Sequence, residues 1–133
     1  MSFSNSLENS ILNHVFGSTT YVPSATLYFG LSTTTPQEDG TGITEPSGNN
    51  YSRVAVTNNI TNFPNTSTSS MKNGIAITFP QASGAWGSCT HWVMMTASSG
   101  GTMLAYGALT TPKSPTNGDT LSFGVNSLII NLD

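Results

Sequence analysis

The first segment with a regular hydrophobic period lies close to the N-terminus. Four apolar residues fall on one face of a helix with 3.6 residues per turn: Leu7, Ile11, Leu12 and Val15. Asn5 followed by Glu8 is typical of a capping box, and Gly17 predicts a left-handed end to the helix. Because a helix of about three turns is marginal alone, we expect it to pack against the domain or a neighbouring subunit.

After Pro23 the period changes to the two-residue alternation of β-strands. A strand is predicted in each of these segments: 25–31, 51–57, 75–79, 91–96, 102–109, 120–125 and 128–132. The turn at 98–101 predicts a hairpin between the fourth and the fifth of them. The stretches between the strands are rich in turn residues, and the longest are predicted as loops at 33–50, 58–73, 82–88 and 112–119.

Seven short strands separated by turn signals favour an all-β fold. We predict an antiparallel β-sandwich or jelly-roll-like domain with a short N-terminal α-helix, a small barrel being the remaining arrangement. A parallel sheet is disfavoured because the sequence lacks helical crossovers. The predicted organisation is an N-terminal helix and arm at 1–22 and a single β-sandwich domain at 23–133.

The composition excludes several classes of protein. Only 7% of the residues are charged and the net charge is −3, so no basic surface for nucleic acid is expected. No apolar stretch is long enough to span a membrane, and a single Cys cannot form an intrachain disulfide. The polar positions are mostly Ser, Thr and Asn, at 19, 20 and 13 residues, which predicts a neutral surface that tolerates close contact with other protein.

Candidates for catalysis are few. Cys89 and His91 could form a nucleophile and its base on one face of a strand, but no orienting third group or oxyanion hole accompanies them. A metal site at these residues lacks further ligands, since the second histidine, His14, lies in the predicted helix. We therefore interpret Cys89 as a buried structural residue and His91 as a core or interface residue.

The acidic residues of the 33–50 loop give a second candidate site. Glu38, Asp39 and Glu45 could supply the carboxylate pair of a glycosidase or hold calcium, but their spacing matches no calcium loop, and we favour a solvated loop. Arg53 is the only cation in the first half of the chain. We expect its guanidinium to anchor a carboxylate or carbonyl groups, within the subunit or across an interface.

Four aromatic residues could stack on sugar rings: Tyr51, Trp86, Trp92 and Tyr106. A domain of this size needs most of its large side chains in the core, so we favour the interpretation that these residues fill the space between two sheets.

Several segments together resemble a known family. These are FSNSLENSILNHVFGSTTYVPSATLYFGLSTTTP, GNNYSRVAVT, NGIAITFPQASGAWGSCTHWVMM and GGTMLAYGALTTPKSPTNGDTLSF, of which ITFPQASGAWGSCTHW and YGALTTPK are the most specific. They are similar to small virion proteins of tailed bacteriophages, usually labelled phage tail-fibre proteins, some of whose relatives look like capsid decoration (cement) proteins. The resemblance covers nearly the whole chain and implies a structural role, with no catalytic residues, metal or cofactor to carry over.

We therefore predict a virion structural protein that is not an enzyme. The favoured function is a capsid decoration protein on the outer surface of the head, where it bridges capsomers of the major capsid protein as a homo-oligomer, most simply a trimer. The helix and the 33–50 loop are its expected contact elements. The alternative is a tail-fibre component that binds a receptor in the manner of an adhesin, with Tyr or Trp residues exposed in a groove. A cell-wall hydrolase is the third, weaker interpretation.

Overall fold

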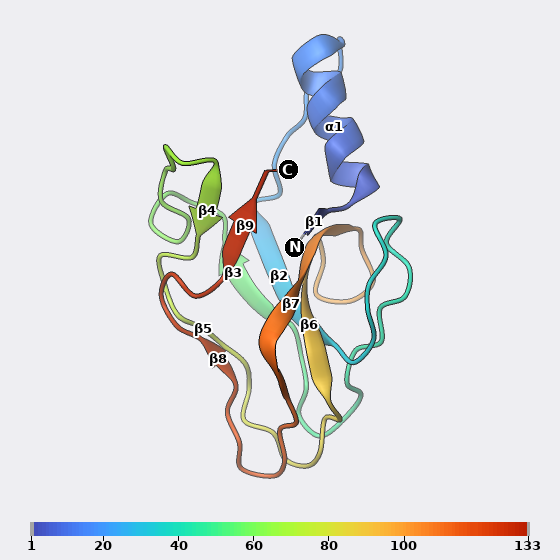
Figure 1. Cartoon of the computed structure of the whole chain (residues 1–133), viewed down its shortest axis with the longest axis vertical. Coiled ribbons are helices and arrows are strands. Elements are labelled where there is room, and N and C mark those ends of the chain that lie inside the picture. The colour runs from blue at the N-terminus through green and yellow to red at the C-terminus, as the bar shows by residue number, and fades with distance from the viewer. Residues whose placement is uncertain (1, 133) are drawn as a thin grey trace.

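A five-stranded antiparallel sheet forms the larger layer of the molecule, with strand order β1-β7-β6-β2-β3. The structure is a computed structural model that describes residues 2–132. The strands of this main sheet are β1 (Ser2–Phe3), β2 (Thr26–Ser32), β3 (Val54–Thr57), β6 (Cys89–Met95) and β7 (Met103–Lys113). The smaller layer holds two two-stranded sheets, β4 (Ser70–Lys72) with β9 (Ile129–Asn131) and β5 (Ile77–Thr78) with β8 (Ser122–Phe123). The predicted all-β class with one short helix is confirmed (Figure 1).

The core lies between the two layers, because apolar side chains alternate along the strands, as the sequence indicates, and those on one face of the main sheet point toward the smaller layer. Leu27, Phe29 and Leu31 of β2 point to this side, and the last two are fully buried. They meet Ile77 and Leu128 from the smaller layer or its flanks. The opposite face of the main sheet carries a separate buried cluster, Val93, Met95 and Met103, against which Ile43 of the 33–50 loop packs. The long loop therefore serves as a cover for the sheet.

The helix α1 (Asn5–Phe16) begins one residue earlier than predicted. Ser4 is the N-cap, with its Oγ accepting a hydrogen bond from the backbone N–H of Leu7 at 3.3 Å, so the predicted cap at Asn5 is wrong. The reason is that β1 ends at Phe3 and leaves Ser4 extended, with φ −73° and ψ 153°, as the position before a helix requires.

The end of α1 also differs from the prediction. Gly17 has φ −116° and ψ −159°, which is extended and not left-handed. Its N–H still donates to the carbonyl of Asn13 at 3.0 Å, and a Cβ on Gly17 would lie 2.7 Å from that oxygen. Glycine is needed here for close approach to the last turn and not for a positive φ.

The helix projects from one end of the molecule (Figure 1). Its base is fixed to the domain, since the N–H of Ser4 donates to Leu104 O and that of Asn5 to Glu38 O, both at 2.8 Å. Leu7 is buried and Ile11 is partly buried against the core. The rest of α1 extends beyond the sheet.

Two strands lie where the sequence predicted a loop or an arm. β4 falls in the 58–73 stretch and pairs with β9, near the other end of the chain. β1 pairs with β7 through Ser2–Tyr106 and Phe3–Ala105, so the segment before the helix belongs to the main sheet. The residues around β1 and β4 show no readable alternation, and only their distant partners define them as strands.

Candidate functional site

Arg53 lies at the centre of a polar cluster beside the main sheet. Its Nε and Nη2 donate to the two carboxylate oxygens of Glu45 at 2.9 Å and 2.8 Å, and its Nη1 donates to the carbonyls of Ala97 and Gly100 at 2.6 Å and 2.8 Å. Tyr51 donates its hydroxyl to the same carboxylate at 2.7 Å. The prediction of Arg53 as an anchor for a carboxylate and carbonyls is confirmed within the subunit.

The charges and hydrogen-bonding groups of this cluster are paired with one another. Burial, the largest influence, raises the pKa of Glu45, but hydrogen bonds from Arg53 and Tyr51 and the charge of Arg53 outweigh it, so the pKa of this carboxyl lies below its usual value. Burial also raises the pKa of the Tyr51 hydroxyl well above its usual value. With every polar atom engaged, the arrangement fastens the 33–50 loop to the hairpin turn between β6 and β7 and offers no free acid or base.

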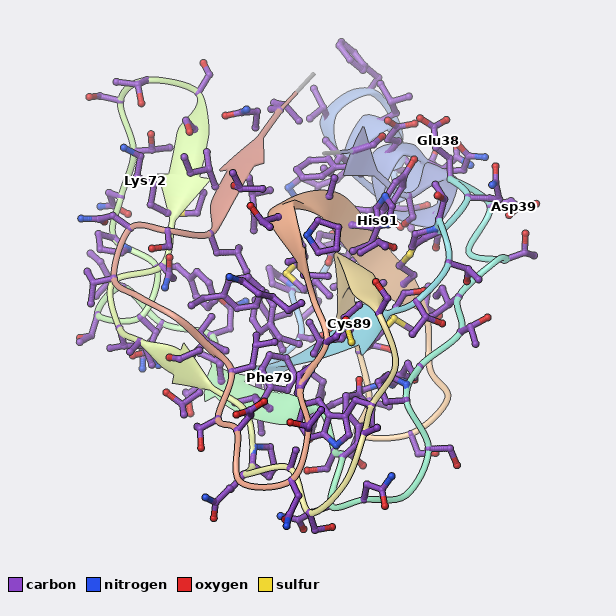
Figure 2. The ribbon with its side chains drawn as sticks, turned by 60° about the horizontal axis from the view of Figure 1, so that its bottom comes forward. Glu38, Asp39, Lys72, Phe79, Cys89 and His91 are labelled. Atoms are coloured by element: carbon purple, nitrogen blue, oxygen red, sulfur yellow. The ribbon has the colours of Figure 1, made fainter. Side chains whose placement is uncertain are left out.

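The structure separates Cys89 from His91. The pairing of β6 with β7 shifts register between these two residues, so the simple alternation that placed them on one face does not hold. Cys89 packs with Leu31 and Trp86 in a core cluster, whereas His91 lies opposite Ser32 in the sheet and its Nδ1 is 2.8 Å from Thr90 Oγ1. Figure 2 shows the two side chains apart. Burial raises the pKa of the Cys89 thiol and lowers that of His91, so neither group is activated by the other.

The loop carboxylates have separate partners. Glu38 accepts a hydrogen bond from Ser2 at 3.0 Å, and Asp39 accepts two from Thr41, which lower the pKa of Asp39. Glu38 and Asp39 lie at the exposed edge of the loop in Figure 2, while Glu45 faces Arg53. Within residues 2–132 no three His, Cys, Asp or Glu side chains gather in a way that could hold a metal ion.

Three of the four aromatic candidates have roles in packing. Trp86 is 4% exposed, and its ring meets that of Tyr51 edge to face with centroids 5.2 Å apart. The Trp86 indole N–H donates to Asn49 O at 2.9 Å. Tyr106 packs at the side of the cluster that the 33–50 loop covers. The interpretation as core between the two layers is confirmed for Trp86, and the half-buried Tyr51 packs against the same cluster. It is wrong for Tyr106, which is half-buried on the opposite face of the main sheet.

Trp92 is also buried, but its edge reaches a cleft. This cleft, about 550 Å³ in volume, lies between the C-terminal half of β7 and the segment 114–128 that contains β8. Its lining residues come in part from β7 and β8, which Figure 1 labels. We refer to it as the β7 cleft. This cleft could not be predicted from the sequence, because its shape depends on how β7 departs from β6.

The second exposed feature is an apolar surface on and after α1. It consists of Leu12, Val15, Phe16 and Val22, which are 53%, 60%, 83% and 78% exposed, and we call it the α1 patch. Leu12 and Val15 were predicted to lie on the packing face, yet only Leu7 and Ile11 of that face meet the domain. Phe16 and Val22 were not recognised because they follow the predicted stripe.

The comparisons with known proteins give one finding. A family model described as "Podophage GP4 fiber I protein gp80" matches residues 2–131. The search of the curated proteins finds no match. Separately, none of the helices within residues 2–132 is both long and apolar enough to cross a membrane.

Proposed function

This chain belongs to the family of the podophage GP4 fiber I protein gp80, and we propose that it is a structural component of a phage fibre whose copies join through the α1 patch. Family membership makes it a bacteriophage virion protein and agrees with the resemblance found in its sequence. The proposal adds the position in the fibre and the manner of assembly.

The α1 patch is the observation that carries the proposal. Leu12, Val15 and Phe16 are spaced by three and four residues, the spacing with which helices interlock. Burying such side chains stabilises an interface by about 1.5–3 kcal/mol each. A helix of this length is also marginal unless something covers its free face.

The occupant that suits the α1 patch is the α1 of other copies. Glu8 is the only acidic residue of the helix, and His14 at its other end already accepts a hydrogen bond from the N–H of Tyr21 through Nδ1. Copies of α1 therefore approach one another with little charge repulsion. A closed ring of three copies is the simplest arrangement that would bury the patch around one axis.

Capsid decoration, the function favoured from the sequence, is the second candidate. Its support is that residues 2–132 form a small compact unit without a repeated shaft, in which the 33–50 loop packs through Ile43 against one face of the main sheet. In that role the α1 patch would contact the major capsid protein instead of other copies.

The two candidates differ in where the protein lies in the particle. We expect a gold-labelled antibody against this chain to mark the tail or fibre of purified virions, with a small number of copies per particle. Labelling spread over the head, with a copy number in the hundreds, would reject the fibre and support decoration.

Self-association is tested on the purified protein. Light scattering after size exclusion should give a mass that is a multiple of 13.9 kDa. Leu12→Ser with Phe16→Ser should reduce it to the single-chain mass while the circular dichroism spectrum still shows a folded protein, because both side chains are exposed in the single chain. Ile60→Ser, which changes an equally exposed residue elsewhere, is the matched control. A wild-type protein of single-chain mass, or an oligomer that survives the double substitution, would contradict assembly through α1.

A further inference from the structure

The β7 cleft results from an irregularity in the sheet. Cys89 is paired with Lys113 and His91 with Ala108, so a step of two residues on β6 spans a step of five on β7. The extra residues of β7 bow away from β6 between these two pairs. Pro112 lies within the bow and has no N–H to contribute to a ladder. The bow and the segment 114–128 enclose the cleft, whose volume is in the range of small-molecule binding sites.

A tryptophan whose indole N–H has no partner is among the residues that line this cleft. Trp92 is 5% exposed and lines the cleft, and within residues 2–132 its indole N–H donates to no acceptor. No buried side-chain nitrogen in that range lacks a partner, so this N–H is accessible to solvent in a residue that lines the cleft. Gly107 makes room for it, since a Cβ there would lie 2.7 Å from Trp92 Nε1. A buried tryptophan usually finds a partner for its N–H, and here an acceptor atom of a ligand would supply it.

The other lining groups combine both charges with hydroxyls. Lys113 is on one wall and Asp119 on the other, and the two form no ion pair with each other. Asp119 accepts two hydrogen bonds from Thr116 through Oδ2, which fix the carboxylate in place. Hydroxyl groups line the walls from Thr110, Thr111, Ser114, Thr120, Ser122 and Ser127. Half-buried Leu109, Leu121 and Phe123 supply the apolar part of the lining.

We propose that the β7 cleft binds an oligosaccharide, a role that goes beyond structural assembly. Sugar hydroxyls both donate and accept, which suits a site with an indole donor, a carboxylate acceptor, an ammonium donor and several hydroxyls. The C–H faces of the ring suit the half-buried apolar side chains. A single lysine is too little charge for a nucleic-acid backbone. An added peptide strand is disfavoured because Pro112 interrupts the edge it would pair with.

The test begins with an array of oligosaccharides from bacterial lipopolysaccharide, capsule and peptidoglycan, probed with the full chain. The array sugar with the strongest signal is then titrated by calorimetry against matched variants. Lys113→Gln removes the charge at the cleft, and Thr110→Tyr fills the cleft from an exposed position, so both should fold. Lys72→Gln removes the same charge outside the β7 cleft and is the control.

We expect Lys113→Gln and Thr110→Tyr to weaken binding at least tenfold and Lys72→Gln to leave it unchanged. Trp92→Phe, which removes only the N–H and part of the ring, should weaken binding if its melting curve shows a folded protein. Failure to bind any array sugar, or binding that both cleft variants leave intact, would overturn the proposal. The assembly function stands apart from this result, since the Leu12→Ser and Phe16→Ser protein should bind the same sugar as well per chain as the wild type.

Discussion

The Arg53 guanidinium and the Glu45 carboxylate face each other through two parallel hydrogen bonds, and a further nitrogen of Arg53 binds two carbonyls of the β6–β7 turn, so that this pair joins the 33–50 loop to that turn. The Arg53 side chain is 7% exposed and that of Glu45 is 23% exposed, so water screens this pair poorly. Such a planar, two-bond pair with two further carbonyl acceptors requires arginine and is not reproduced by lysine.

Substitution of Arg53 should therefore destabilise the fold strongly. Arg53→Ala leaves Glu45 partly buried without its partner and leaves two carbonyls without a donor, and we expect a loss of about 3 kcal/mol in the free energy of unfolding. Urea denaturation followed by tryptophan fluorescence measures it. Arg53→Lys should recover only part of the loss, and Lys72→Gln on the surface should change stability little. Equal stability of Arg53→Ala and wild type would mean that the pair does not hold the loops.

The same pair predicts an acid-sensitive stability. Because the pKa of Glu45 is lower in the folded protein than in the unfolded chain, its contribution is complete above the ordinary glutamate pKa of about 4.3. The contribution is lost as the pH falls through the folded pKa, when Glu45 takes up a proton. Glu45→Gln should be less stable at pH 7 and should show a weaker dependence on pH between neutral and acid conditions. Parallel pH profiles for the two proteins would contradict this assignment.

Gly107 should resist any larger residue. A Cβ on Gly107 would meet Nε1, Cε2 and Cζ2 of Trp92 at 2.7–2.9 Å, and the Trp92 ring is packed in the core cluster. We expect Gly107→Ala to cost about 1–3 kcal/mol of stability, the usual range for an overpacked core. Thermal unfolding measures the loss. Ala108→Val, at the exposed neighbouring position, is the control and should have a small effect.

Cys89 should react with thiol reagents only after unfolding. Its side chain is buried and burial raises the pKa of the thiol, so little reactive thiolate is present at neutral pH. A colourimetric disulfide reagent should label no thiol in the native protein at pH 7.5 and one thiol per chain in denaturant. Rapid labelling of the native protein would show an accessible thiol and would reopen the question of chemistry at Cys89.

The sequence predicted best those elements whose period is long enough to read. β2 and β6 each carry seven residues, and their alternation located them to within one or two residues. β1 and β4 were missed because the sequence around them shows no alternation, and their strand character comes from pairing with β7 and β9. The N-cap at Ser4 was missed for a related reason. The spacing of Asn5 and Glu8 matches a capping box, and only the pairing of β1, which ends at Phe3, determines that the helix begins one residue earlier.

Of the candidate sites, too, some could be predicted from the sequence and others could not. The role of Arg53 followed from the chemistry of its side chain and from its isolation among neutral residues. The β7 cleft could not be predicted, because it requires the unequal pairing of β6 and β7 that separates Cys89 from His91. The α1 patch was predicted only in part. The sequence indicated the apolar stripe of the helix, but not which residues of that stripe the domain leaves exposed.

Because α1 is fixed to the domain at its first turn, the two ends of the molecule differ: one carries the helix and the other does not. The helix leaves one pole, while the turns at 82–88 and 114–119, joined through Ala82 and Asp119 and through Trp86 and Pro115, lie at the other (Figure 1). Copies gathered by their helices would all point these turns away from the junction. Substitutions in these turns would then change the outward surface of the assembly while the interface between the helices stays the same.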